Sequence, residues 1–300
     1  MALAEDKKSA QSSKAGEPET AGVVTRSVDV WRGSADGNGN ASVSVADCVA
    51  KETAVALVYN GVSHAVMMAT PLDLEAFALG FSLSEGIVNS AGDIYECAID
   101  EVELGIEVAL TISSQCFTKL KDKRRNLSGR TGCGICGAES LQQVHLPIPP
   151  VVADFSISHV AIDRATRALA EHQPLQALTG ALHAAAWCDV DGKLVQVCED
   201  VGRHNALDKL IGLLWQQQSG EQKGLAGRAG WLLISSRASY EILQKSAMVN
   251  IAIVVAISAP TSLAIEIAEQ AGITLIGFSR ENRHIVYTNA HRLLPSGDSA

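Results

Sequence analysis

The stretch GWLLISSRASYEILQKSAMVNIAIVVAISAPTSLAIEIAEQAGITLIGF, residues 230–278, alternates short apolar runs with segments of helical periodicity. Strands that alternate with helices predict an α/β layer whose strands pair largely in parallel. The apolar runs have no polar side that could face water, so neither face of the sheet should be exposed. The elements predicted here are strands at 230–236, 251–258 and 273–278, and helices at 239–250 and 261–271.

The residues before this stretch extend the same layer. Residues 194–200, LVQVCED, predict a strand that leads directly into a helix at 203–217. Another helix is predicted at 158–171, with Pro174 stopping it. We therefore expect an α/β C-terminal lobe over residues 151–300.

The first half of the chain has a different pattern. Residues 52–68 predict two strands joined at Asn60-Gly61, because Asn-Gly favours the tight turn of a hairpin. Next, Thr70 is expected to cap a helix, with Pro71 at its first position and Asp73 as the capping-box acid. The hairpin followed by a helix indicates a mixed, strand-rich unit.

Residues 100–112, DEVELGIEVALTI, alternate apolar with polar or small side chains, which predicts a half-buried strand. A strand-rich N-terminal lobe is thus expected over 23–150, with the lobe boundary near Pro147–Pro150. Residues 1–22 are expected to form a disordered tail, and the Gly/Asn-rich residues 33–42 a flexible segment. The predicted fold class is α/β with two lobes.

Composition excludes several classes of protein. A hydrophobic fraction of 47% with 19% charged residues is typical of a globular protein, and 4% aromatic residues are too few for base-stacking platforms. A net charge of −9 argues against nucleic-acid binding. The longest apolar run, residues 248–259, is interrupted by Asn250 and is shorter than the ~20 residues of a membrane helix. The charged N-terminal sequence does not have the apolar run of a signal peptide. We expect a soluble, cytoplasmic protein without a membrane or nucleic-acid partner.

The cysteines favour the same compartment. Their number is odd and only Cys133 and Cys136 are close in sequence, which argues against a framework of disulfides. In a reducing cytoplasm, a close pair is typically metal-binding or reactive. The seven cysteines are Cys48, Cys97, Cys116, Cys133, Cys136, Cys188 and Cys198.

Four chemistries compete for the Cys133/Cys136 pair, and the first three each need residues or a context that this sequence does not offer. Structural zinc needs four ligands, whereas the pair supplies two and His145 is the only histidine nearby. A zinc deaminase needs His-x-Glu before the cysteines, but His183 follows them and is followed two positions later by Ala185, so deamination is rejected. A thioredoxin-like site places the pair at a helix start, whereas here glycines flank the pair and a basic loop is expected before it.

Carriage of a persulfide is the fourth chemistry. It needs an accessible thiolate, and neighbouring cations lower a thiol pKa and increase the thiolate fraction. Glycines allow a loop to move between a donor and an acceptor, and a second cysteine can release the sulfur as a disulfide forms. A solvated basic face is the simpler alternative, and the residues alone leave it open. The cations before the pair are Lys119, Lys121, Lys123, Arg124, Arg125 and Arg130.

Four long motifs carry a resemblance to a known family. They are NGVSHAVMMATP with FALGFSLSEGI (60–87), GRTGCGICG (129–137), CEDVGRHNALDKL (198–210) and SSRASYEILQKSAM (235–248). They resemble the FdhD family of formate dehydrogenase accessory sulfurtransferases. The similarity runs from residue 25 to residue 292 and leaves out the Gly/Asn insert.

The resemblance implies a route for sulfur. A cysteine desulfurase would load a persulfide onto Cys133, with Cys136 supporting its release. The sulfur would pass to the molybdenum cofactor, bis(molybdopterin guanine dinucleotide), which is a bound substrate for a formate dehydrogenase. The family further implies a homodimer, no permanently bound metal, and a fold similar to that of cytidine deaminases without their zinc site. A non-catalytic cofactor-binding chaperone with a zinc-bound or redox-active cysteine pair is the alternative.

The cofactor is polyanionic, so its site should combine cations with backbone N–H groups at helix starts. In α/β sheets such sites lie at the carboxyl ends of the strands, where this chain has hydroxyl and arginine side chains. Among them, Asp200 is predicted to accept hydrogen bonds from guanine and Arg203 to neutralise phosphate, although a helix cap and a satisfied His204 are alternatives. Candidate residues from the strand ends are Asp200, Arg203, His204, Ser236 and Arg237; the resemblance adds Phe278, Ser279, Arg280, Glu281, Asn282 and Arg283.

Overall fold

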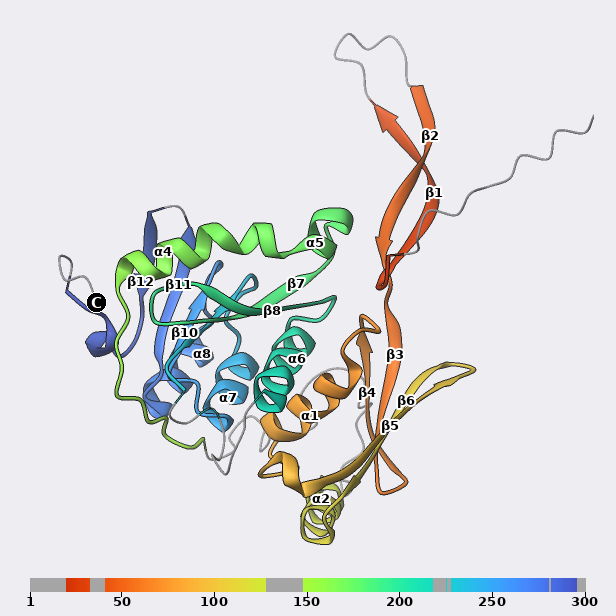
Figure 1. Cartoon of the computed structure of the whole chain (residues 1–300), viewed down its shortest axis with the longest axis horizontal. Coiled ribbons are helices and arrows are strands. Elements are labelled where there is room, and N and C mark those ends of the chain that lie inside the picture. The colour runs from red at the N-terminus through yellow and green to blue at the C-terminus, as the bar shows by residue number, and fades with distance from the viewer. Residues whose placement is uncertain are drawn as a thin grey trace, which may run out of the picture.

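The computed structural model describes residues 20–32, 41–127, 148–217, 225, 228–280 and 282–295. Its strands form three sheets: a two-stranded ribbon, a four-stranded sheet in the order β4-β3-β6-β5, and a six-stranded sheet in the order β12-β11-β10-β9-β7-β8. Figure 1 shows the four- and six-stranded sheets on opposite sides of helices α1 and α6, with the ribbon projecting away from both. The predicted α/β fold class is confirmed.

The six-stranded sheet mixes strand directions. Strand β10 pairs in parallel with β9 and β11, whereas the other neighbours pair antiparallel. The parallel pairing expected for the strands of residues 230–278 is confirmed for β9, β10 and β11, whereas the sheet as a whole is mixed. The short connections between β7 and β8 and between β11 and β12 are hairpins, which pair antiparallel. Its strands are β7 (His183–Cys188), β8 (Leu194–Asp200), β9 (Trp231–Ile234), β10 (Ile253–Ala256), β11 (Thr274–Arg280) and β12 (Arg283–Val286).

Helices cover both faces of this sheet, as the apolar strands predicted (Figure 1). Alternate side chains of a strand point to opposite faces, so Leu233 packs with Ile162 of α4 while Leu232 packs with the other helices. The Ser158 hydroxyl accepts the Ala161 N–H at the start of α4. The helices of this lobe are α4 (His159–Ala168), α5 (Pro174–Thr179), α6 (Arg203–Gln216), α7 (Tyr240–Met248) and α8 (Ser262–Ala271).

Two boundaries in this lobe differ from the predicted ones. Helix α4 ends at Ala168 and continues as a 3-10 turn, Leu169–His172, while Pro174 begins the short helix α5. Proline is favoured in the first helical turn because its missing N–H has no intrahelical partner there. Gly272 ends α8 in the left-handed conformation, with φ 73°, as a glycine cap should.

The four-stranded sheet begins with the predicted hairpin. Strands β3 (Thr53–Tyr59) and β4 (Val62–Ala69) are joined at Asn60 and Gly61, whose φ angles are 47° and 77°. Positive φ at both positions is the reason Asn-Gly suits this turn. The hairpin prediction is confirmed.

The strand predicted over residues 100–112 is two strands. It contains the end of β5 (Ile94–Val102) and all of β6 (Gly105–Ile112), with Leu104 in the turn between them and 88% exposed. Apolar and polar side chains continue to alternate through the turn, so the periodicity of the sequence did not reveal that the chain reverses direction there. A Cβ at Gly105 would lie 2.2 Å from the Ala54 carbonyl oxygen, which explains the glycine after the turn.

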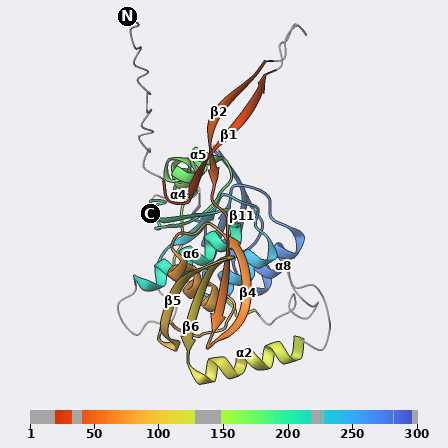
Figure 2. The same cartoon turned by 90° about the vertical axis from the view of Figure 1, so that its right-hand side faces the viewer.

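Helix α1 (Leu74–Ser84) begins later than predicted, because Asp73 is its N-cap residue with φ 51° and makes no side-chain cap. Thr70 does not cap it and is instead fully buried. The segment after β6, predicted to be a basic loop, is helical: α2 (Ser114–Leu127) reaches beyond Arg125 and lies at the end of the four-stranded sheet (Figure 2).

The projecting ribbon consists of β1 (Val23–Arg32) and β2 (Ala41–Ala50), which pair antiparallel. Positions 41 and 42, predicted as flexible, belong to β2, while 33–40 lie outside the described residues. The predicted tail also lies outside them up to position 19. Among the described residues, no helix is long and apolar enough to cross a membrane.

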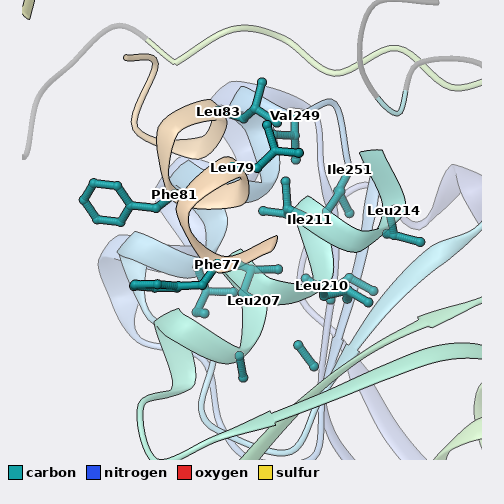
Figure 3. Close-up of a cluster of buried hydrophobic side chains, with 14 of the residues drawn as sticks. Phe77, Leu79, Phe81, Leu83, Leu207, Leu210, Ile211, Leu214, Val249 and Ile251 are labelled. Atoms are coloured by element: carbon teal, nitrogen blue, oxygen red, sulfur yellow. The ribbon is translucent and has the colours of Figure 1, made fainter. Parts of the chain in front are cut away.

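The lobes share one apolar core at the α1–α6 contact (Figure 3). Leu79 and Leu83 of α1 lie in the same cluster as Leu207 and Ile211 of α6. A Cβ on Gly212 would lie 1.9 Å from the Ala76 carbonyl oxygen. The helices therefore cross at a separation that only glycine permits here. The lobe boundary near residue 150 stays a prediction.

Candidate functional site

The carboxyl ends of strands β8, β9, β10 and β11, which were predicted to lie at one edge of the sheet, do lie at one edge. Helices α6 and α7 contact each other at their starts, where His204 pairs with Glu241. Ala238, just before α7, forms a bridge with Pro260, just before α8. The Phe278 N–H donates to the Ser258 carbonyl at 3.1 Å, which joins the end of β11 to the same edge. Three helix starts and one hairpin therefore surround this carboxyl edge of the sheet.

At the start of α6, the side chains of Arg203 and His204 both contact one acid, Glu241. His204 Nε2 lies 2.7 Å from Glu241 Oε2, and the Arg203 guanidinium lies 3.8 Å from the same oxygen. The hydrogen bond from His204 holds the pKa of the Glu241 carboxyl below its usual value, although burial opposes this. Glu241 was not among the predicted residues, because only the contact between two helices reveals it.

His183 lies beside this pair, opposite Asp200 in the β7–β8 register. Burial, with the nearby charges of Arg203 and His204, lowers the pKa of His183. The Arg203 Nε atom is buried and has no hydrogen-bond partner within the described part of the chain. The Arg203 side chain as a whole is partly exposed, and a guanidinium is suited to contact a phosphate-bearing ligand.

Asp200 does not lie where a residue that contacts guanine would have to lie. It is fully buried, and its carboxylate lies 2.7 Å from Lys209 Nζ. The carboxylate also accepts hydrogen bonds from the Thr70 N–H at 3.0 Å, from the Gly202 N–H at 2.8 Å and from the Asn205 side chain at 3.0 Å. Both oxygens thus have internal partners, and neither reaches solvent where guanine could bind. The prediction for Asp200 has no geometric support.

Of the two residues predicted at the end of β9, one is buried and the other is exposed. Ser236 is buried and its hydroxyl donates to the Arg237 carbonyl at 3.1 Å. The Arg237 side chain is exposed at the carboxyl edge. Of the two, only Arg237 presents a side chain that a ligand could contact.

The stretch 278–283 forms the end of β11 and the start of β12. Phe278 has φ 50° and sits where the β11–β12 register shifts, a bulge that redirects the following side chains. Arg280 and Arg283 pair directly across the hairpin and both are exposed. Like charges directly opposite each other repel, so an anion bound to both would relieve an unfavourable pairing. Glu281 lies outside the described residues.

Two of the predicted residues in this hairpin face α4 instead of the edge. Ser279 is buried, with its hydroxyl 2.6 Å from that of Thr166. The Asn282 side chain accepts a hydrogen bond from Arg167. These contacts hold the hairpin against the helix, and no local sequence pattern predicted them.

Cys133 and Cys136 lie outside the described residues, so their predicted roles remain predictions. The other cysteines are free thiols. Burial raises the pKa of Cys97 to about 11 and that of Cys198 to about 12, and it raises the pKa of Cys188 as well. Thiols with such values carry little thiolate at neutral pH. Cys188 and Cys198 are both buried in the core, which disfavours their thiolate forms.

Helix α2 ends six residues before Cys133 in the sequence. Cys116 and Leu120 face the core, whereas Lys119 and Lys121 are exposed. Lys121 Nζ lies 4.7 Å from the centre of the Phe117 ring. The basic segment is therefore an amphipathic helix that leads toward the cysteine pair. Among the described residues no group of three or more His, Cys, Asp or Glu side chains could hold a metal ion.

These features define a class of protein: an α/β protein with exposed arginine side chains at the carboxyl edge of its larger sheet and, in the sequence, a cysteine pair that follows a basic helix. The chain belongs to the FdhD/NarQ family, whose sequence profile matches residues 50–294. It is 55% identical over 247 residues to the sulfur carrier protein FdhD of Cupriavidus necator, covering 82% of this chain and 84% of that protein. It is 51% identical over 245 residues to the protein of the same name from Acinetobacter baylyi, covering 81% and 87%.

The fold is also similar to a solved structure. The crystal structure of a candidate formate dehydrogenase accessory protein from Desulfotalea psychrophila matches with a TM-score of 0.68 and 25% sequence identity. The match covers 91% of this chain and 99% of that protein. Both lobes therefore belong to one known architecture. The likeness to cytidine deaminases stays a prediction.

Proposed function

We propose that this protein is a sulfur carrier that takes persulfide sulfur from a cysteine desulfurase and delivers it to the molybdenum cofactor of a formate dehydrogenase. The observation that carries the proposal is its identity of more than half, over most of its length, with proteins named sulfur carrier protein FdhD. A solved structure named as a formate dehydrogenase accessory protein shares its fold. The free thiols among the described cysteines support a reducing, cytoplasmic location.

The carrier residue is Cys133. Three of the other cysteines have thiols whose pKa is raised by burial, which makes them poor nucleophiles. Cys133 is preceded by a helix that carries exposed lysines, whose charge favours a thiolate. This contrast supports the cysteine pair as the reactive thiols of the chain.

The transfer balances as two displacements. The Cys133 thiolate attacks the terminal sulfur of the donor persulfide, a new S–S bond forms, and the donor leaves as a thiolate. Attack by the Cys136 thiolate on Cys133 then expels the terminal sulfur as hydrosulfide, and Cys133 and Cys136 are oxidised to a disulfide. A cellular thiol or dithiol reductant must reduce that disulfide before the next cycle.

The acceptor is bis(molybdopterin guanine dinucleotide), which is held as substrate. Its phosphates suit the carboxyl edge, where Arg203 offers an unpaired Nε and Arg280 lies opposite Arg283. Arg237 adds positive charge at the same edge, and His204 adds a ring nitrogen that can hydrogen-bond. Binding and orientation of this polyanion are the tasks that these side chains support. We also propose that the carrier acts as a homodimer, which its mass in solution would test.

The decisive experiment is intact-mass analysis after incubation with a cysteine desulfurase and cysteine. The wild-type chain should gain one sulfur atom, and Cys133→Ala should gain none and fail to activate formate dehydrogenase. Cys136→Ala should still accept sulfur but deliver it poorly. Cys48→Ala is the matched control, because Cys48 is partly exposed in the ribbon and should be dispensable.

Full loading and full activation by Cys133→Ala would refute the assignment. Zinc bound stoichiometrically by the wild-type chain, together with an absence of sulfur loading, would instead identify a cofactor-binding chaperone. The two outcomes are distinct because a zinc-bound thiolate is no longer available to attack a persulfide.

A further inference from the structure

The hairpin that carries Arg280 and Arg283 is held by one face of helix α4. The contacting residues are His159, Asp163, Thr166 and Arg167, and spacings of three and four residues place side chains on one side of a helix. The opposite side of the same helix, with Ile162 and Ala165, packs into the apolar core. One side of α4 therefore presents a line of polar side chains that contact the hairpin.

Asp163 is the centre of this contact. Its Oδ1 accepts the Asn282 backbone N–H at 3.0 Å, and its Oδ2 lies 2.9 Å from the Arg167 guanidinium. Arg167 in turn donates to the Asn282 side chain. The hydrogen bond from Arg167 holds the pKa of the Asp163 carboxyl below its usual value, so it is ionised at neutral pH. The three groups form a closed ring of charge-assisted hydrogen bonds.

Asn282, which this ring holds, has an unfavourable backbone conformation. Asn282 has φ 56°, in the left-handed region, and stands in the turn between Arg280 and Arg283. Left-handed backbone at a non-glycine residue is retained where surrounding contacts enforce it. Two further contacts flank the ring: the Ser279–Thr166 hydroxyl pair, and His159 stacked on His284 with ring centres 4.9 Å apart.

We propose that Asp163 is a positioning residue for anion binding, which fixes Asn282 so that Arg280 and Arg283 are held together as a clamp for the phosphates of the guanylate substrate. The inference rests on the proposed function for its substrate class. Directly paired residues of a hairpin lie on one face, so a fixed turn sets the separation of the two guanidinium groups. Without the ring, their mutual repulsion would separate them.

The test uses GDP as the probe and the full chain, with binding measured by calorimetry at one salt concentration. Asp163→Ala should weaken GDP binding about tenfold, the effect expected when a charged hydrogen bond that orders the site is lost. Asp163→Asn should lose less, because its amide oxygen can still accept the Asn282 N–H. Arg164→Ala is the matched control, because Arg164 lies next to Asp163 but donates to the Asp191 carbonyl; its affinity should equal that of the wild type.

A double-mutant cycle separates positioning from general destabilisation. In an Arg280→Ala background, Asp163→Ala should weaken binding by less than about threefold, because the clamp it positions is already broken. An undiminished tenfold loss in that background, or wild-type affinity in Asp163→Ala alone, would overturn the proposal. Failure of the wild-type chain to bind GDP would also overturn it. Sulfur loading of the wild-type chain, measured separately, tests the proposed function and does not depend on this result.

Discussion

Two acid–cation pairs lie at the start of helix α6, and their surroundings give them opposite roles. Asp200 and Lys209 are fully buried at the junction of the lobes, 2.7 Å apart. Glu241 and His204 are also 2.7 Å apart but remain partly exposed at the carboxyl edge. The buried pair has no contact left for a ligand, whereas the partly exposed pair lies beside the Arg203 side chain, which is itself partly exposed. Residue type alone therefore does not distinguish a structural charge from a binding one.

Burial explains the difference. Removing water makes an unpaired charge very costly, so Asp200 is surrounded by donors from Thr70, Gly202 and Asn205. Because Thr70 belongs to the N-terminal half of the chain, the hydrogen bond from its N–H also joins the two halves. A second buried cluster, in which Lys245 contacts Asp208 and Ser84, joins them at the other end of α1.

The largest expected effect is on folding stability. Asp200→Ala leaves the Lys209 charge buried without a counter-ion and should lower the free energy of unfolding by about 3–5 kcal/mol. Glu241→Ala, at the exposed pair, should lower it by only about 0–1 kcal/mol. Urea unfolding of the two variants measures the contrast. Equal losses of unfolding free energy would show that burial does not make the Asp200–Lys209 pair more important for stability than the Glu241–His204 pair.

The next effect concerns ligand binding. Arg280→Ala and Arg283→Ala should each weaken GDP binding by about 1.5–3 kcal/mol, and the wild-type affinity should fall as salt rises, because exposed ion pairs are screened. Lys193→Ala serves as control, because Lys193 is exposed in the β7–β8 turn before β8, away from the strand ends. If both arginine variants bind like the wild type, the hairpin is not part of the site.

The next effect concerns the basic residues near the end of helix α2. Replacing Lys123, Arg124 and Arg125 with Gln should slow sulfur loading of Cys133 several-fold, roughly the effect of raising its thiol pKa by up to one unit. A thiolate effect should be partly rescued at alkaline pH, whereas a steering effect should persist there and shrink at high salt. Loading rates across pH and salt separate the two. Unchanged rates under all conditions would make α2 a solvated face.

The smallest effect is a pH dependence at the exposed pair. The pKa of Glu241 is lower in the folded chain than its ordinary value of 4.5, so its contribution to stability is present above that pH and is lost as the pH falls below it. Glu241→Gln should therefore be less stable than the wild type near neutral pH by about 1 kcal/mol or less, with the difference vanishing in acid. A constant difference across pH would show that the charge of Glu241 is not involved.

Much of the fold was predictable from local pattern. The Asn60-Gly61 hairpin, the strand–helix alternation after residue 230 and the Gly272 cap each depend on nearby residues, and the structure has all three. The prediction failed where a local pattern had two readings. The alternation at 100–112 continued through a turn, and the charged, glycine-rich composition before Cys133 hid a helix up to Leu127.

The candidate site divides in the same way. Sequence located its cations at the strand ends and found the cysteine pair, because strand order and family motifs are readable along the chain. It could not find Glu241, Asp163 or Lys209, whose partners lie on other elements. It also predicted Asp200 as a ligand contact, although its carboxylate faces Lys209 in the core.

By itself, the sequence determined the α/β class, the family, and the position of the thiol pair after a basic segment. Only the tertiary structure decided which charges are available to a ligand. The Asp200–Thr70 hydrogen bond joins residues 130 positions apart, and the Asn282–Asp163 bond joins residues 119 apart. The periodicity of apolar residues indicates which face of its own helix or strand a residue lies on. Burial of a charge and the partner that satisfies it depend on which elements pack together.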